Sequence, residues 1–217
     1  MRILAQFISW ILMPLIIPAL ALAIVLFLPT ELSFTNHNSL YFWDIGAKKY
    51  LIGIFLFFGF ILPGFSVFIM RYARMIKSVE METQRERSIP LILTAVYCMF
   101  LILLLLKLNT TTIISAHLFG LAFSGLFMAL LFAISNASFK ISLHAGGAGM
   151  LIAFVLSYSL DQTVFLFWPI YMTVLLAGII LFARLYLQKH TPKELYLGFI
   201  LGSIVTFIAD YQCVLWF

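Results

Sequence analysis

Long apolar runs separated by short polar stretches make up most of the chain. A helix needs about 20 apolar residues to cross a bilayer. Seven runs approach or reach that length: roughly 5–28, 50–70, 90–107, 111–134, 145–160, 164–183 and 195–216. The pattern predicts an all-α fold, namely a polytopic membrane helix bundle with about six to seven transmembrane helices. Because neither a linker nor a repeat interrupts it, we expect residues 1–217 to form a single integral membrane domain.

Two local features qualify this pattern. Prolines at 14, 18 and 63 fall inside runs, where neighbouring helices can satisfy the backbone carbonyls that proline frees. The fifth run is short and begins with the letters AGGAGM, so we expect its start to be bent or partly buried in protein. The run after Arg2 is much longer than the roughly 7–15 residues of a signal-peptide core, so we predict that it is a retained first span.

Composition supports a membrane protein and bears on its partners. Hydrophobic residues make up 64% of the chain, whereas soluble domains are about 45–50% apolar. The net charge is +5, from 13 Lys and Arg against 8 Asp and Glu. In membrane proteins basic residues mostly mark loops on the cytoplasmic side, so we expect membrane lipid as a partner and no nucleic acid. The sequence leaves the oligomeric state unknown.

The order of the runs places three polar loops on one side of the membrane. With seven spans, the loops at 71–89, 135–144 and 184–194 share a side with the N-terminus. That side carries ten of the 13 basic residues. The positive-inside rule therefore predicts a cytoplasmic N-terminus, in what we expect to be a bacterial inner (cytoplasmic) membrane.

Histidines accompany the basic residues in two of these loops. The candidate residues are Lys140, Ser142 and His144 in the fourth loop and Arg184, His190 and Glu194 in the sixth. Cationic, multidentate donors balance the charge of a phosphoryl group. A histidine can act as nucleophile or general acid near neutral pH, and a carboxylate beside it can fix its tautomer. Together these are the parts of a metal-free phosphomonoesterase.

The stretch ARLYLQKHTPKELYLG at 183–198 resembles the third signature of the type 2 phosphatidic acid phosphatase (lipid phosphate phosphatase) superfamily. That signature is Ser-Arg, five residues, His, three residues and Asp. Arg184, His190 and Glu194 keep this spacing, although Ala183 replaces the serine and Glu194 replaces the aspartate. The letters ISLH at 141–144 are similar to the second signature, Pro-Ser-Gly-His, in their serine and histidine.

The first signature of the superfamily, Lys, six residues and Arg-Pro, is poorly kept. Pro90 follows Arg87 by three residues instead of one. Arg85 or Arg87 could supply the missing charge, and Lys140 could substitute from the neighbouring loop. The resemblance therefore covers about 140–202 well and 71–90 thinly.

The resemblance implies hydrolysis of a lipid phosphate or diphosphate through a phosphohistidine, without metal or organic cofactor. Candidate substrates are phosphatidate-, phosphatidylglycerophosphate- and polyprenyl-diphosphate-like lipids, whose tails would enter sideways from the bilayer. In this scheme His190 attacks phosphorus, His144 protonates the leaving oxygen and Glu194 orients His190. The phosphoryl oxygens would be held by Arg184, Lys140, Ser142 and Arg87.

Other interpretations remain open at this stage. The chain could be a catalytically degenerate member of the family, or a small transporter or assembly protein of the membrane. Ser142 also fits the N-cap of a helix. Thr191, Pro192 and Glu194 fit an N-cap, a first helical residue and a capping-box acid.

Two ionisable residues lie away from these loops. We expect His117, inside the fourth span, to be an interhelical histidine that forms a hydrogen bond. We expect Asp210, towards the far end of the seventh span, to lie at the membrane interface.

Overall fold

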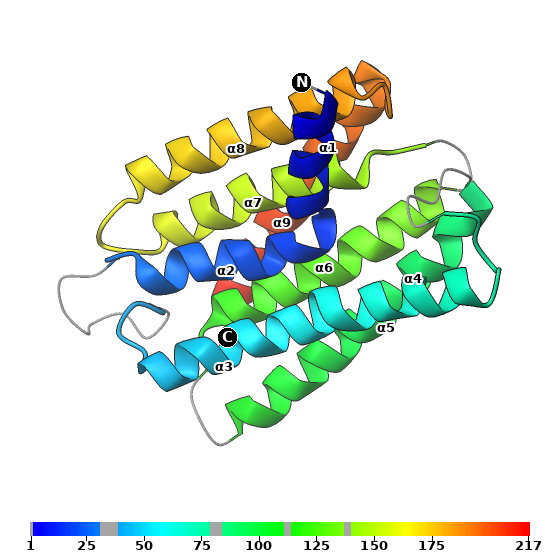
Figure 1. Cartoon of the computed structure of the whole chain (residues 1–217). Coiled ribbons are helices and arrows are strands. Elements are labelled where there is room, and N and C mark those ends of the chain that lie inside the picture. Colours follow the sequence, from blue (N-terminus) through cyan, green and yellow to red (C-terminus); the bar gives the residue numbers. More distant parts are fainter. Residues whose placement is uncertain (1, 31–38, 79–83, 111–113, 137–139) are drawn as a thin grey trace.

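In the computed structural model, which describes residues 2–30, 39–78, 84–110, 114–136 and 140–217, every regular element is a helix (Figure 1). Seven helical segments are long and apolar enough to cross a membrane: Arg2–Phe27, Ile45–Tyr72, Glu86–Asn109, Ala116–Ser135, Leu143–Leu160, Phe167–Tyr186 and Pro192–Trp216. These segments confirm the predicted all-helical, multi-pass architecture.

The first span is broken into three pieces near its middle. It consists of α1 (Arg2–Ile11), the 3-10 helix η1 (Pro14–Ile16) and α2 (Ile17–Phe27). Pro14 has no N–H to donate and forces the residue before it into an extended conformation, and Met13 has φ −67° and ψ 148°. As a result α1 leaves the direction of α2 and packs against α8 (Phe167–Tyr186), as Figure 1 shows.

The second span contains a different irregularity, a π-helical turn. The π-helix η2 (Phe57–Ile61) joins α3 (Ile45–Leu56) to α4 (Leu62–Tyr72). The N–H of Leu62 bonds to the carbonyl of Phe57, one residue further back than in an α-helix. Pro63 follows directly, and its ring would clash with a carbonyl of an uninterrupted α-helix. The wider turn therefore lets the span continue past the proline.

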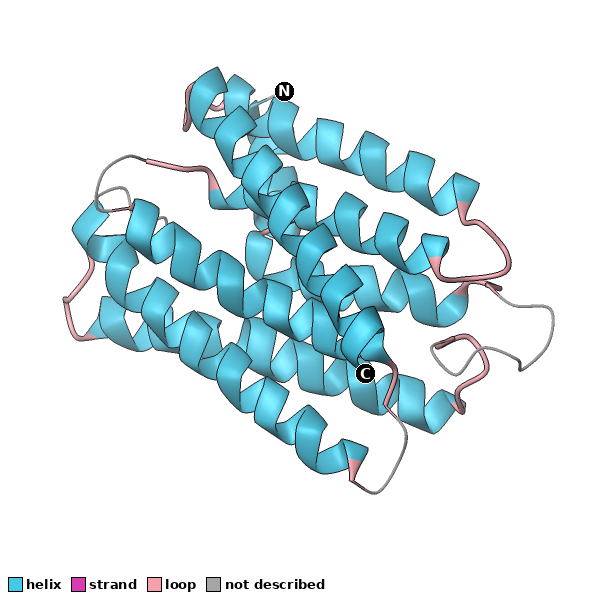
Figure 2. Cartoon of the chain, turned by 180° about the vertical axis from the view of Figure 1, so that it is seen from behind, coloured by secondary structure: helices cyan, strands magenta, loops and turns pink. Residues whose placement is uncertain are grey.

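The remaining spans are α5 (Gln84–Asn109), α6 (Ala116–Ser135), α7 (Leu143–Leu160), α8 and α9 (Pro192–Trp216). Helix α7 lies inside the bundle, against α9, α8 and α2. Its glycines allow this, because a Cβ added at Gly149 would collide with the backbone of Phe199 on α9. The expectation of a start partly buried in protein is confirmed. Figure 2 shows α9 from behind, ending at the C-terminus.

The packing explains why so much apolar surface stays outside. One buried apolar cluster links α2, α3, α5, α6 and α7, with Leu22, Phe55, Leu105, Phe119 and Phe154 among its members. Many other large apolar side chains, such as Phe68, Trp168 and Ile204, are exposed. A soluble protein rarely exposes extended apolar patches, whereas hydrocarbon solvates them well.

Candidate active site

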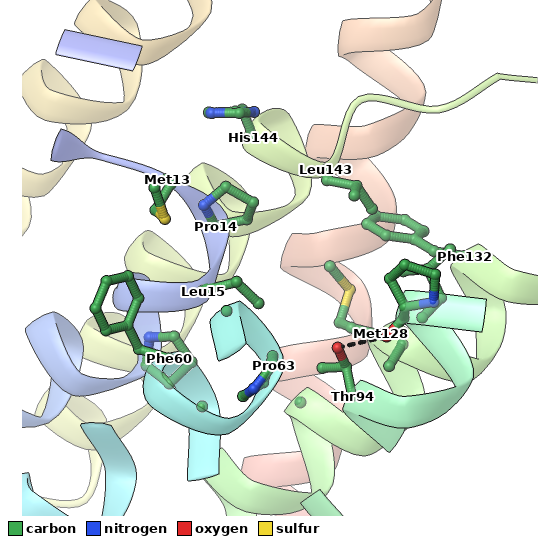
Figure 3. A pocket seen from close by; sticks show the side chains of 18 of the residues that line it. Met13, Pro14, Leu15, Phe60, Pro63, Thr94, Met128, Phe132, Leu143 and His144 are labelled. Carbon is green, nitrogen blue, oxygen red and sulfur yellow. Dashed lines mark hydrogen bonds between the residues drawn. The ribbon is translucent and has the colours of Figure 1, made fainter. Parts of the chain in front are cut away.

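Four basic side chains from separate segments surround one cavity of about 390 Å³. They are Arg87 from α5, His144 from α7, Arg184 from α8 and His190 from the segment before α9. His144 is labelled in Figure 3, beside Met13 and Pro14 of the first span. All four belong to the residues predicted from the sequence, and all lie at the end of the bundle that loop order had assigned to them. The structure therefore brings the charged part of the predicted constellation together.

His190 and Glu194 form a directed pair. Nδ1 of His190 lies 2.9 Å from Oε2 of Glu194, and the histidine side chain is only 3% exposed. A carboxylate can only accept a hydrogen bond, so Nδ1 carries the proton and donates it. Nε2 of the neutral ring then keeps a lone pair, which is the form a nucleophile requires.

The surroundings keep this ring neutral. Burial lowers the pKa of His190 to about 4, and the positive charges of Arg184 and Lys140 act in the same direction. The hydrogen bond with Glu194 opposes them without outweighing them. His190 is therefore neutral at neutral pH, and its Nε2 keeps an unprotonated lone pair.

Glu194 has two roles at once. Its Oε2 also accepts a hydrogen bond from the Thr191 N–H at 3.2 Å, and the Glu194 N–H donates to the Thr191 hydroxyl at 3.3 Å. This is a complete capping box at the start of α9, with Pro192 as the first helical residue. The structural role and the role towards His190 therefore coexist on one carboxylate.

Ser9 on α1 joins the site, although its sequence context carries no signal. Its hydroxyl accepts a hydrogen bond from Nη1 of Arg184 at 2.8 Å, and its carbonyl lies 3.1 Å from Nε2 of His144. The last carbonyls of a helix have no partner within the helix, and the break before Pro14 leaves this one available. Because a carbonyl only accepts, Nε2 of His144 carries a proton, as a general acid must.

Two predicted phosphate ligands do not line the cavity. Ser142 is fully buried, and its hydroxyl accepts a hydrogen bond from the Ala145 N–H as the N-cap of α7. Its position supports the capping interpretation. Lys140 is half-buried and its Nζ donates to the Lys189 carbonyl at 3.4 Å. It acts on the site through its charge on the neighbouring His190.

Arg85 and Arg87 are the two candidates for the charge of the poorly kept first signature, and the structure describes the side chain of Arg87. Arg87 is buried, in the first turns of α5, and lines the cavity with Pro90. The side chain of Arg85 lies outside the described part of the structure. Arg87 is therefore the first-signature candidate whose side chain the structure places at the cavity.

A second ionisable cluster lies at the opposite end of the bundle. Nδ1 of His117 lies 2.9 Å from Oδ2 of Asp210, and Nε2 lies 3.2 Å from Oδ2 of Asp161. The hydrogen-bonded interhelical role predicted for His117 is confirmed. The interfacial position predicted for Asp210 stays a prediction. The side chain of Asp210 is completely buried against α6. Gly120 makes this possible, since a Cβ there would collide with Asp210.

The cationic cavity combines a neutral histidine, a second histidine that presents a proton and two guanidinium groups. Such a set can bind an anion of phosphate type and both attack it and protonate a leaving group. No protein-family model, curated protein or solved structure matches this chain. Function is therefore argued from the site itself.

Proposed function

We propose that the protein is a membrane phosphatase that hydrolyses a lipid phosphate or diphosphate through a phosphohistidine intermediate. The observation that carries the proposal is the convergence of Arg87, His144, Arg184 and His190, from four segments, on one cavity between membrane-spanning helices. The resemblance of 140–202 to the type 2 phosphatidic acid phosphatases supports the same chemistry.

The first half-reaction uses the two histidines in opposite roles. Nε2 of His190 attacks phosphorus, and a bond forms between them while the bond from phosphorus to the leaving oxygen breaks. His144, in the imidazolium form that a bound phosphate dianion favours, gives its Nε2 proton to that oxygen and becomes neutral. Glu194 accepts the hydrogen bond from Nδ1 and stabilises the positive charge that develops on the His190 ring.

The second half-reaction returns the enzyme to its starting state. His144, now without its Nε2 proton, removes a proton from water, and the resulting hydroxide attacks phosphorus. The bond between phosphorus and His190 breaks, and inorganic phosphate leaves. Arg87 and Arg184 stabilise negative charge on the non-bridging oxygens in both steps, and such preorganised charge is usually the largest single contribution to catalysis.

A phosphate-release assay with the purified protein tests the proposal. The panel contains phosphatidate, phosphatidylglycerophosphate and a polyprenyl diphosphate in mixed micelles, with and without EDTA. We expect release that persists in EDTA and is inhibited by vanadate, which imitates five-coordinate phosphorus. Absence of release from every lipid phosphate and diphosphate would favour a catalytically degenerate protein.

We also propose a side for the site, from the distribution of basic residues. Arg71 lies in the last turn of α4 and Arg74 just after it, where the positive-inside rule acts strongly. We therefore propose that the site opens at the cytoplasmic face of a bacterial inner membrane. The test is a cysteine at Ser78 in a Cys98→Ala, Cys213→Ala background. We expect no labelling by a membrane-impermeant maleimide in intact spheroplasts, and labelling there would invert the assignment.

A further inference from the structure

The cavity extends far beyond its charged end, into the apolar middle of the bundle. Besides the four basic residues it is lined by Met13, Pro14, Leu15 and Pro18 of the first span, Gly59, Phe60, Pro63 and Gly64 of the second, and Pro90, Thr94 and Cys98 of α5. Figure 3 shows Phe60 and Pro63 facing Met128 and Thr94 across it, with His144 at the far end. A phosphate would occupy only the charged end of this space.

The apolar part has a definite depth. Arg87 and Cys98 are eleven positions apart on α5, which corresponds to about 16 Å at a rise of 1.5 Å per residue. Cys98 is the residue furthest along α5 that lines the cavity. Leu101 and Leu105, further along α5, belong to the buried apolar cluster, so we take the level of Cys98 as the depth of the cavity.

The two irregular spans meet beside the apolar part. A Cβ at Gly59 on the π-helix would be in van der Waals contact, at 3.6 Å, with the Leu15 carbonyl oxygen of the first span. Both irregular elements, the break at Pro14 and the turn before Pro63, contribute glycine or proline residues to the walls. These walls lack the bulk that regular, side-chain-filled helices would place there.

We propose that this cavity binds the hydrocarbon chain of the substrate inside the protein and limits its length. The site takes one chain of a lipid phosphate, with the phosphate between Arg87 and Arg184 and that chain running towards Cys98. An extended chain advances about 1.2 Å per bond, so the depth matches about a dozen carbons. The inference rests on the proposed function, because the same residues hold the phosphate.

The chain enters from the bilayer between α1 and α4. Trp10 on α1 is exposed and lines the cavity. Gly64 and Val67 on α4 line it as well. Because α1 turns away from α2 towards α8, it does not close this side as a continuous first span would. A lipid chain can therefore pass sideways without the phosphate leaving the interfacial level.

The test measures binding without turnover, using linear alkyl phosphonates from hexyl to octadecyl and the shift in melting temperature of the detergent-solubilised protein. For a chain that is buried on binding, each added methylene tightens binding by up to about fourfold. We expect this gain to stop near a dozen carbons. A gain that continues unbroken to octadecyl, or no dependence on chain length, would overturn the inference.

Two glycines provide a matched pair of variants. A Cβ at Gly64 or at Gly178 meets nothing within 4 Å, but only Gly64 lines the cavity. Gly64→Leu should lower the chain length at which binding stops improving. Gly178→Leu, at an exposed position on α8, should leave that chain length unchanged. Met150→Ala shortens a side chain that lines the cavity, so it should raise that chain length. The same limiting chain length in the wild type and in all three variants would also overturn the inference.

The same series separates this inference from the proposed function. In one outcome, the chain length at which phosphonate binding stops improving shifts in Gly64→Leu, but the protein releases no phosphate from any lipid. That outcome would support the chain site and reject the phosphatase. Phosphate release with equal efficiency from dodecyl and octadecyl phosphate, and equal responses in Gly64→Leu and Gly178→Leu, would support the phosphatase and reject the chain site.

Discussion

The two ends of the bundle each hold buried histidine, but their surroundings are opposite. At one end His144 and His190 stand with Arg87 and Arg184 around a cavity. At the other end His117 lies between Asp161 and Asp210 and has Tyr158 packed edge-on against it, with ring centroids 4.8 Å apart.

The difference separates an anion-binding site from a structural connection. Each ring nitrogen of His117 already faces a carboxylate, so the cluster is held together by its own contacts and ties α6 to α9 and to the end of α7. The cationic end places two guanidinium groups beside a cavity, which is an arrangement that can bind an anion. A histidine within a membrane span is therefore informative about function only together with the charges and space around it.

The largest expected effect is on turnover and distinguishes the two ends directly. His190→Ala removes the proposed nucleophile, so we expect phosphate release to fall by about 10⁴-fold or more. His117→Asn should leave turnover per folded molecule within a few-fold. Initial rates, normalised to monodisperse protein, measure both, and a His190→Ala variant with full activity would refute the mechanism.

A second prediction concerns the stability of the protein and not its activity. Asp210→Ala leaves the buried His117 without its closest partner, and breaking a buried ion pair costs about 3–5 kcal/mol. Asp161→Ala removes the more exposed partner, whose side chain is 28% exposed, so it should cost less. Melting temperatures in detergent check the order, and equal losses in both variants would contradict the assignment of Asp210 as the principal partner.

A third prediction separates the two roles of Glu194. Glu194→Gln removes the negative charge but keeps a hydrogen-bonding group, and we expect a loss of about 10²–10³-fold in turnover, similar to the loss of one preorganised hydrogen bond. Glu194→Asp, the superfamily's residue, should stay closer to wild type in turnover while weakening the capping box with Thr191. If Glu194→Gln lowered the melting temperature and left turnover unchanged, the carboxylate would be only a cap.

A fourth prediction concerns Ser9. Ser9→Ala removes the hydroxyl that accepts from Arg184 but keeps the carbonyl that accepts from His144. The net value of one such hydrogen bond to a charged group is about 1.5–3 kcal/mol. We expect turnover to fall by about tenfold or somewhat more, with rescue in Ser9→Thr. An unaffected Ser9→Ala would mean that α1 contributes nothing to the geometry of Arg184.

The smallest expected effect is a pH dependence. An unfolded histidine titrates near 6.5, whereas burial lowers the pKa of His190 to about 4 in the folded protein. The unfolded state binds this proton first as the pH falls, so the folded state loses stability between about pH 6.5 and about pH 4.

Lys140→Gln removes a positive charge that lowers the pKa of His190, so it should raise that pKa. The acid limb of phosphate release would then move to higher pH by a fraction of a unit. Pre-incubation at each pH, followed by assay at neutral pH, separates reversible titration from unfolding. An acid limb that moves to lower pH in Lys140→Gln would contradict this electrostatic account.

The sequence predicts the spans and most of the charged site because both depend on local signals. Apolar runs set the seven helices, and the spacing of Arg184, His190 and Glu194 within one segment places their side chains near each other. Loop order then brings His144 to the same end. These are properties that a short stretch of chain, or the number of crossings, is enough to determine.

What the sequence does not predict depends on packing between distant segments. Ser9 reaches Arg184 only because α1 breaks away at Pro14 and packs on α8, and a single serine in an apolar run gives no sign of this. The contact of Asp210 with α6 gives no sign in the sequence either. Its burial depends on the space that Gly120 leaves on α6. Both residues act through contacts across more than 90 positions.

The π-helical turn at Phe57–Ile61 makes the cavity sensitive to the gain or loss of a single residue. A π-turn differs from an α-turn by one additional residue in the hydrogen-bonded ring. Deleting one residue there would restore a regular helix and rotate everything after it by about 100°, given 3.6 residues per turn. Gly64 and Val67 would then leave the cavity wall and bulkier neighbours such as Phe65 would take new positions. A single codon gained or lost in this stretch would thus change the shape of the cavity without replacing any charged residue.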